Sequence, residues 1–161
     1  MGERLTVGEV CTRSVTLAFG GTTLAGAAAL MRENHVGSLV VVQETGGLRV
    51  VVGMLTDRDV VTAVIAPGLD AQVLRVEDVM STDLLTARED DSLIDLMQAM
   101  RRKGVRRVPV VGPQGELVGL VALDDVLEIL SQELALLVDT IRAGTRRERQ
   151  LRPAEPAILS A

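Results

Sequence analysis

The sequence predicts a mixed α/β (α+β) protein built from a duplicated unit, and three observations support this prediction. The 161-residue chain is 47% hydrophobic and 24% charged, a composition typical of a protein that folds around an apolar core. Apolar runs bounded by glycine or proline alternate with segments of helical periodicity. The stretch Gly53-Met54-Leu55-Thr56-Asp57-Arg58-Asp59 returns 66 residues later as Gly119-Leu120-Val121-Ala122-Leu123-Asp124-Asp125. A repeat of this length indicates two copies of a supersecondary unit that pack on each other.

Two further stretches recur in the same order as the glycine motif. Val7-Gly8-Glu9-Val10 returns as Val76-Glu77-Asp78-Val79, and the stretch 36–42 returns as 105–111, both at an offset of 69 residues. The first copy therefore carries three extra residues, which we place in the turn around 44–49.

The first copy is predicted to run strand–helix–strand–strand–helix after a short helical turn. The expected elements are the turn at 7–10, a strand at 15–17, a helix from Leu24 that Asn34-His35 ends, strands at 38–43 and 49–55, and the motif helix. Thr22 or Thr23 is expected to cap the first helix, and Pro67-Gly68 to end the second.

The second copy is predicted to have the same order of elements. They are a helical turn at 76–79, a strand at 84–86, a helix capped near Asp91-Ser92 and ended by Gly104, strands at 108–111 and 117–121, and a final helix. We therefore divide the chain into repeats at 5–67 and 76–132, a linker at 68–75, and an extension with a tail at 133–161.

The final helix is longer than one repeat needs. An apolar stripe continues beyond the repeat, at spacings of three and four residues, through Val126, Leu130, Leu134, Leu137 and Ile141. We prefer a homodimer contact to intramolecular cover, because exposed apolar stripes usually find partners.

The tail after Gly144 turns basic and loses its apolar period. We expect it to be frayed or disordered, with its arginines at 146, 147, 149 and 152 followed by Pro153 and Pro156. An anionic-surface or nucleic-acid role for these arginines is the less favoured alternative.

The composition excludes several function classes. The formal net charge is −5 and the chain has one Phe and no Trp or Tyr, so neither general affinity for nucleic acid nor base stacking is expected. With Cys11 and His35 as the only cysteine and histidine, no intrachain disulfide, Cys/His zinc site or nucleophile–base pair is expected. We expect a protein that is not an enzyme, because no nucleophile–base pair can be drawn from these two residues. The chain lacks a signal-peptide core and an apolar run of about 18 residues, so we expect a cytoplasmic protein.

The glycine motif itself allows two interpretations. Thr56 stands where a helix N-cap belongs and Asp59 follows three residues later, which is the pattern of a capping box. The alternative is a ligand site, because free amides at a helix start suit phosphate and a carboxylate can accept two hydrogen bonds from a ribose diol. The same carboxylate would repel phosphate, and the residues alone favour the cap.

Both copies of the Gly-apolar-X-Thr/Ser-X-X-Asp junction, each with its preceding Val-X-Asp/Glu-Val lead, resemble a pair of CBS (cystathionine β-synthase) domains. The resemblance covers roughly residues 5 to 132, including stretches 31–38 and 106–111, and the second copy departs from the motif at Ala122. It implies two β-α-β-β-α repeats about a pseudo-twofold axis and a homodimer. It also implies a regulatory module that binds AMP, ADP, ATP or S-adenosylmethionine, with Mg²⁺ as a companion of the polyphosphates and no obligatory cofactor.

The resemblance also implies two unequal clefts between the repeats. The residues implied for the first are Thr56, Asp59, Met80, Asp83, Leu84, Leu85, Arg106 and Arg107, with the arginines pairing with phosphate. The residues implied for the second are Ser14, Val15, Thr16, Gly37, Ser38, Ala122 and Asp125. The second cleft lacks the motif hydroxyl and any cation at the start of the strand, so we expect it to reject polyphosphates or stay empty.

Two alternatives remain beside the nucleotide sensor, which would modulate a protein partner that the sequence does not identify. One is a ligand-independent dimerisation or docking module, and the other is a sensor of S-adenosylmethionine. Arg106 and Arg107 are also open to a second interpretation, as solvated charges that follow the helix ending at Arg101-Arg102-Lys103.

Overall fold

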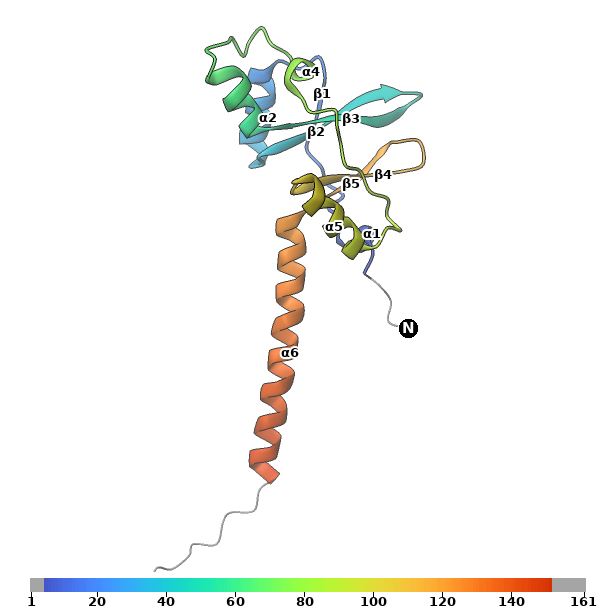
Figure 1. Ribbon diagram of the computed structural model, residues 1–161, viewed down its shortest axis with the longest axis vertical. Coiled ribbons are helices and arrows are strands. Elements are labelled where there is room, and N and C mark those ends of the chain that lie inside the picture. Colours follow the sequence, from blue (N-terminus) through green and yellow to red (C-terminus); the bar gives the residue numbers. More distant parts are fainter. Residues whose placement is uncertain (1–4, 152–161) are drawn as a thin grey trace, which may run out of the picture. The chain divides into compact units, whose positions relative to one another are not determined.

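The computed structural model describes residues 5–151, which divide into one compact unit that ends at Leu123 and another that begins at Asp124. The first unit holds the sheets of both copies of the repeat, one small sheet in each copy (Figure 1). The second unit is a helix.

The first sheet has three strands in the order β1-β2-β3, namely Leu17–Phe19, Ser38–Thr45 and Leu48–Thr56. β1 and β2 are parallel and joined by the helix α2, Leu24–Asn34, whereas β2 and β3 form an antiparallel hairpin. The hairpin turn needs two residues with positive φ, and Gly46 and Gly47 supply them at 59° and 79°. The sheet buries an apolar face that includes Leu39, Val41 and Leu55.

The second sheet has two strands, β4 (Arg107–Val111) and β5 (Leu117–Ala122), so the expected strand at 84–86 is wrong. Only Ala87 pairs with β4, through an isolated parallel bridge to Val110. In the first copy Val40 donates its N–H to the carbonyl of Thr16 at 3.3 Å. The equivalent residue in β4 is Pro109, which has no N–H, so the parallel ladder ends there.

The helix ends follow the signals in the sequence. Thr23 caps α2 by accepting the Gly26 N–H at 3.1 Å, and His35 ends it in the left-handed conformation at φ 54°. The helix α5, Leu93–Lys103, ends at Gly104 with φ 71°. The motif helix α3, Asp57–Val60, continues as a π-helical segment over Val61–Ile65, and Gly68 turns the chain at φ 73°. The expected ends of these helices are confirmed.

The short helices at 7–10 and 76–79, which we call the lead-in segments, are exchanged between the two copies, so that each packs on the other copy. The helix α1, Val7–Val10, lies beside α5 of the second copy, and α4, Val76–Val79, lies near β1 and the start of α2 (Figure 1). Val7 donates its N–H to the carbonyl of Asp91 at 2.9 Å, and Val76 donates to Thr22 at 2.9 Å. Val76 is fully buried in the core of the first copy. Each copy therefore completes the other.

The exchange explains the glycine of each motif. The segment after α4 crosses β3 through a bridge between Ser81 and Met54, and the segment after α1 crosses β5 through a bridge between Thr12 and Leu120. A Cβ atom on Gly119 would lie 2.9 Å from the carbonyl oxygen of Thr12, closer than a side chain can approach.

The two sheets meet where β3 pairs with the segment that leads into β5. Val50 and Glu116 form an antiparallel bridge there, and these two residues are equivalent in the two copies, 66 positions apart. An antiparallel bridge between equivalent residues lies on the pseudo-twofold axis that relates the repeats.

The helix α6, Leu123–Leu151, is continuous over 29 residues, and all of it after Leu123 belongs to the second unit (Figure 1). The expectation of a frayed tail after Gly144 is therefore wrong up to residue 151. One helical glycine costs only about 1 kcal/mol, and the residues around Gly144 include the strong helix formers Ala143, Arg146 and Glu148. Arg152, Pro153 and Pro156 lie outside the described residues. No helix in residues 5–151 is long and apolar enough to cross a membrane, and the cytoplasmic location stays a prediction.

The contact at Gly119 can be tested by adding one methyl group. We expect Gly119→Ala to lower the free energy of unfolding by about 1–3 kcal/mol, because the methyl group displaces a hydrogen-bonded backbone carbonyl. Gly21→Ala is the matched control, because a Cβ atom there meets nothing within 4 Å. Urea denaturation of both variants measures the difference, and equal stability would contradict the crowding argument.

Candidate functional site

A cavity of about 350 Å³ lies where the end of β3 meets two segments of the second copy. The two segments are 81–85, which follows α4, and 104–107, which joins α5 to β4. The lining residues are Gly37, Met54, Thr56, Asp57, Arg58, Asp59, Ser81, Asp83, Leu84, Leu85, Gly104, Val105, Arg106 and Arg107.

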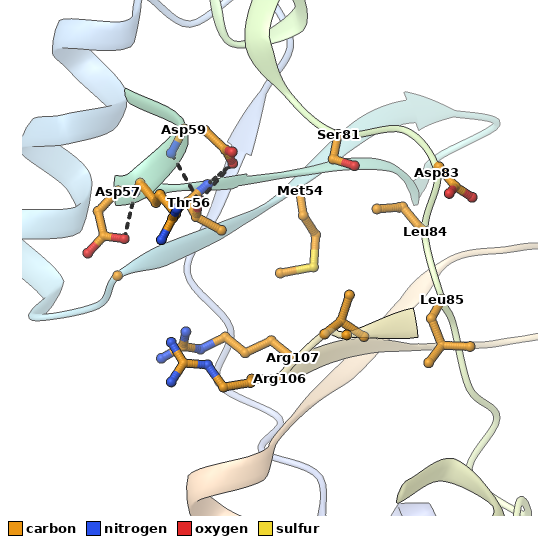
Figure 2. Close-up of a pocket in the computed structure, with 14 residues that line it drawn as sticks. Met54, Thr56, Asp57, Asp59, Ser81, Asp83, Leu84, Leu85, Arg106 and Arg107 are labelled. Atoms are coloured by element: carbon orange, nitrogen blue, oxygen red, sulfur yellow. Dashed lines mark hydrogen bonds between the residues drawn. The ribbon is translucent and has the colours of Figure 1, made fainter. Parts of the chain in front are cut away.

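One wall of the cavity is the capping box at the start of α3. The Oδ2 atom of Asp59 accepts hydrogen bonds from both the backbone N–H and the hydroxyl of Thr56, each at 2.8 Å, and the Thr56 hydroxyl accepts the Asp59 N–H at 3.2 Å (Figure 2). The predicted capping box is confirmed. The bonds fix the Asp59 carboxylate in a half-buried position at the cavity surface.

The amides at the start of α3 already have acceptors. The N–H of Asp57 donates to the carbonyl of Gly37 at 3.0 Å, and the N–H of Arg58 donates to the Asp57 carboxylate at 2.8 Å. The Asp59 N–H is taken by Thr56. A phosphate at this helix start would find no free amide and would face two carboxylates, so that part of the ligand-site interpretation is wrong.

Two cations, Arg106 and Arg107, lie on the wall opposite the capping box, whereas a third lining cation, Arg58, lies in α3 beside the box. Figure 2 shows the guanidinium groups of Arg106 and Arg107 directed toward the same end of the cavity as Thr56 and Asp59. Gly104 ends α5 and turns the chain, and Arg107 begins β4, paired with Ala122. Neither arginine forms an ion pair with another of the described residues.

The other end of the cavity is apolar. Leu84 and Leu85 lie there, and Figure 2 shows them away from the arginines, with Met54 between them and the capping box. All three side chains are half-buried. In the first copy Val40 donates a hydrogen bond to the carbonyl of Thr16. The equivalent Pro109 in β4 has no N–H and cannot donate one to the carbonyl of Leu85. The Asp83 carboxylate pairs with the Lys103 ammonium at 2.5 Å, so its charge is compensated.

Seven of the eight residues implied for the first cleft line this one cavity, and their ligand contacts stay a prediction. The eighth, Met80, packs against the core of the first copy instead, and Ser81 lines the cavity. The sequence analysis also missed Met54, Asp57 and Arg58 as lining residues. The recurring motif already contained all three, but the bridge that brings Ser81 beside Met54 joins segments distant in the sequence.

The residues implied for the second cleft come from the segment before β1, the start of β2, the end of β5 and the start of α6. Gly37 lines the first cavity instead, because β2 pairs with β3 and places it beside Asp57. Ser14 is exposed and Val15 and Thr16 are half-buried before β1, and Ser38 is buried at the start of β2. Ala122 ends β5, and Asp125 lies in the first turn of α6 and so in the second unit. The second cleft stays a prediction.

No cluster of His, Cys, Asp or Glu that could hold a metal ion occurs within residues 5–151. The cavity therefore offers carboxylate, hydroxyl and guanidinium groups together with an apolar surface. Such a set of groups suits an organic ligand with both polar and apolar parts.

Comparison with known proteins identifies the family. The CBS domain pattern matches residues 7–66 and 76–132, in register with the two copies, and the chain belongs to the CBS domain family. CBS domain pairs are regulatory modules that bind small ligands.

Two relatives and one solved structure illustrate the match. The chain is 34% identical to an uncharacterized protein MK0525 of Methanopyrus kandleri over 78% of its own length and 62% of that protein. It is 40% identical to the CBS domain-containing protein YhcV of Bacillus subtilis, over 74% and 81% of the two chains. The fold matches the CBS domain pair of protein MJ0100, solved in complex with 5′-methylthioadenosine and S-adenosyl-L-methionine. The TM-score is 0.70 at 23% identity, covering 81% and 99% of the two chains.

The capping box can be tested by comparing two threonines of the same segment. Thr56→Ala should lower the free energy of unfolding by about 1 kcal/mol, because Asp59 loses its N–H acceptor and one donor. Thr62→Ala removes only an exposed hydroxyl that donates to the Arg58 carbonyl, and should change stability by less than about 0.5 kcal/mol. Chemical denaturation of the two variants distinguishes a structural cap from a hydroxyl held for other reasons.

Proposed function

We propose that this cavity binds an adenine nucleotide (AMP, ADP or ATP) and that its occupancy modulates a protein partner. The observation that supports this function is the pairing of Thr56 and Asp59 on one wall with Arg106 and Arg107 on the other. A nucleotide needs a diol acceptor, a phosphate-binding cation and an apolar slot, and the lining residues include all three.

The adenine ring would lie at the apolar end. The sole phenylalanine, Phe19, does not line the cavity, so the ring would lie between the aliphatic side chains of Met54, Leu84 and Leu85. Both bonds from Thr56 go to Oδ2 of Asp59, which leaves Oδ1 to accept from a ribose diol.

The phosphate would lie at the arginines. Charge-assisted hydrogen bonds contribute roughly 1.5–3 kcal/mol each, and guanidinium groups match phosphate in a bidentate geometry. The same cations disfavour the sulfonium of S-adenosylmethionine, one of the ligands in the MJ0100 complex. We therefore rank a nucleotide above S-adenosylmethionine for this chain.

Binding would signal through the contact between the copies. The capping box belongs to the first copy, whereas Leu84, Leu85 and both arginines belong to the second. A ligand that touches both walls stabilises one arrangement of the two copies over others, and a partner that senses this arrangement responds.

The diol acceptor can be tested by calorimetry. Asp59→Ala should abolish micromolar binding of AMP, ADP and ATP, because the variant loses the ribose acceptor. A partner that is bound equally well by the wild type and by Asp59→Ala would favour the ligand-independent docking module. Absence of heat and of thermal shift with every adenosyl compound, S-adenosylmethionine included, would reject the sensor.

The phosphate contact can be tested separately with adenosine. Arg107→Ala should weaken AMP binding by roughly tenfold to a hundredfold and leave adenosine affinity nearly unchanged. Arg101→Ala is the control, because Arg101 is exposed in the last turn of α5 and does not line the cavity. Equal losses for AMP and adenosine would contradict a phosphate role for Arg107.

A further inference from the structure

We propose that α6 pairs with α6 of a second copy of the chain as an antiparallel coiled coil centred on Asp139. The proposal concerns the second unit alone and is independent of ligand binding in the cavity. It rests on the seam of the helix, on its charge distribution and on the fit of its layers.

The seam repeats every seven residues. Its positions alternate at three and four residues, and they are Leu127, Leu130, Leu134, Leu137, Ile141, Gly144, Glu148 and Leu151. Six of the eight are Leu or Ile, and each of these six is between 39% and 71% exposed. Such a spacing is the pattern of a coiled-coil seam, and at 1.5 Å per residue it extends over about 36 Å. An exposed apolar seam of this length indicates that a partner helix packs against it.

The charge on α6 is divided along its length. The half from Leu123 to Asp139 carries five acids and no base, whereas residues 142–149 carry four arginines and one acid. A parallel pair would place the acidic halves together and the basic halves together. An antiparallel pair places each acidic half against a basic half, so charge complementarity selects a second copy in the antiparallel orientation.

The seam layers fit the same orientation. Antiparallel pairing about Asp139 places Leu127 against Leu151, Leu130 against Glu148, Leu134 against Gly144, and Leu137 against Ile141. The leucine at 134 fills the space that glycine leaves. A parallel pair would instead place Gly144 against Gly144 and Glu148 against Glu148, which gives one gap and one repulsive layer.

The antiparallel register also creates ion pairs beside the seam. Glu133 of one copy lies beside Arg147 of the other, and the symmetry produces this pair twice. Within one helix the two residues are 14 positions and about 21 Å apart, so they do not interact in a single chain.

Disulfide trapping tests the orientation in the full chain. In a Cys11→Ala background we would prepare Leu130→Cys and Glu148→Cys separately, mix them under reducing conditions, and oxidise the mixed and unmixed samples. The proposal expects a covalent dimer in the mixed sample only. The mixed dimer should be lost when Leu137→Asp is added and kept when Leu136→Asp is added. Leu136 is 68% exposed on the same helix but lies outside the seam, which makes it the matched control.

Three outcomes would overturn the proposal. Disulfides in the unmixed samples would show a parallel pair. No disulfide in any sample would show that a second copy of α6 does not cover the seam. A full chain that is monomeric by sedimentation equilibrium at the oxidation concentration would likewise show that the seam has no second copy as its partner.

A charge exchange provides an independent readout. Glu133→Arg and Arg147→Glu should each raise the dimer dissociation constant about three- to tenfold, and the double variant should restore it. Failure of the double variant to recover would contradict the antiparallel register, because in a parallel pair these residues never meet.

Discussion

The exchange of lead-in segments is the constraint on which the rest of the first unit depends. Val7 and Val76 are fully buried, and each bonds through its backbone to the opposite copy, at Asp91 and Thr22. The core of each copy therefore includes a buried valine from the lead-in segment of the other copy. The duplicated sequence therefore folds as one interlocked unit, and the two sheets hold fixed positions relative to each other.

The cavity is a product of this exchange. The segment after α4 crosses the end of β3 at the bridge between Ser81 and Met54, and this crossing brings Leu84 and Leu85 to the capping box. Gly53 leaves room for the crossing, because a Cβ atom there would lie 2.5 Å from Met80 Sδ and 3.2 Å from the carbonyl oxygen of Ser81. The glycine that first marked the motif in the sequence thus lies at the packing contact between the copies.

Features set by local sequence could be predicted, and features set by pairing could not. The ends of α2 and α5 and the bonds between Thr56 and Asp59 follow from residues within one helical turn. The expected strand at 84–86 fails because of Pro109, which is distant in sequence, and Gly37 joins the first cavity because β2 pairs with β3. The seven residues found in the cavity came from the family resemblance, since composition and periodicity carry no information about which segments cross.

The bridge between Val50 and Glu116 has a consequence for the origin of the chain. These residues are equivalent in the two copies. Two molecules of a single ancestral repeat could therefore have built the same interface as a homodimer, in which this residue of one molecule pairs with the same residue of the other. After two such genes fuse, each half packs against the other half and no longer against an identical molecule, so the two halves can differ in sequence. Arg106 and Arg107 occupy the positions that Gly37 and Ser38 occupy in the first copy. Only a fused gene can acquire such a difference between its two halves.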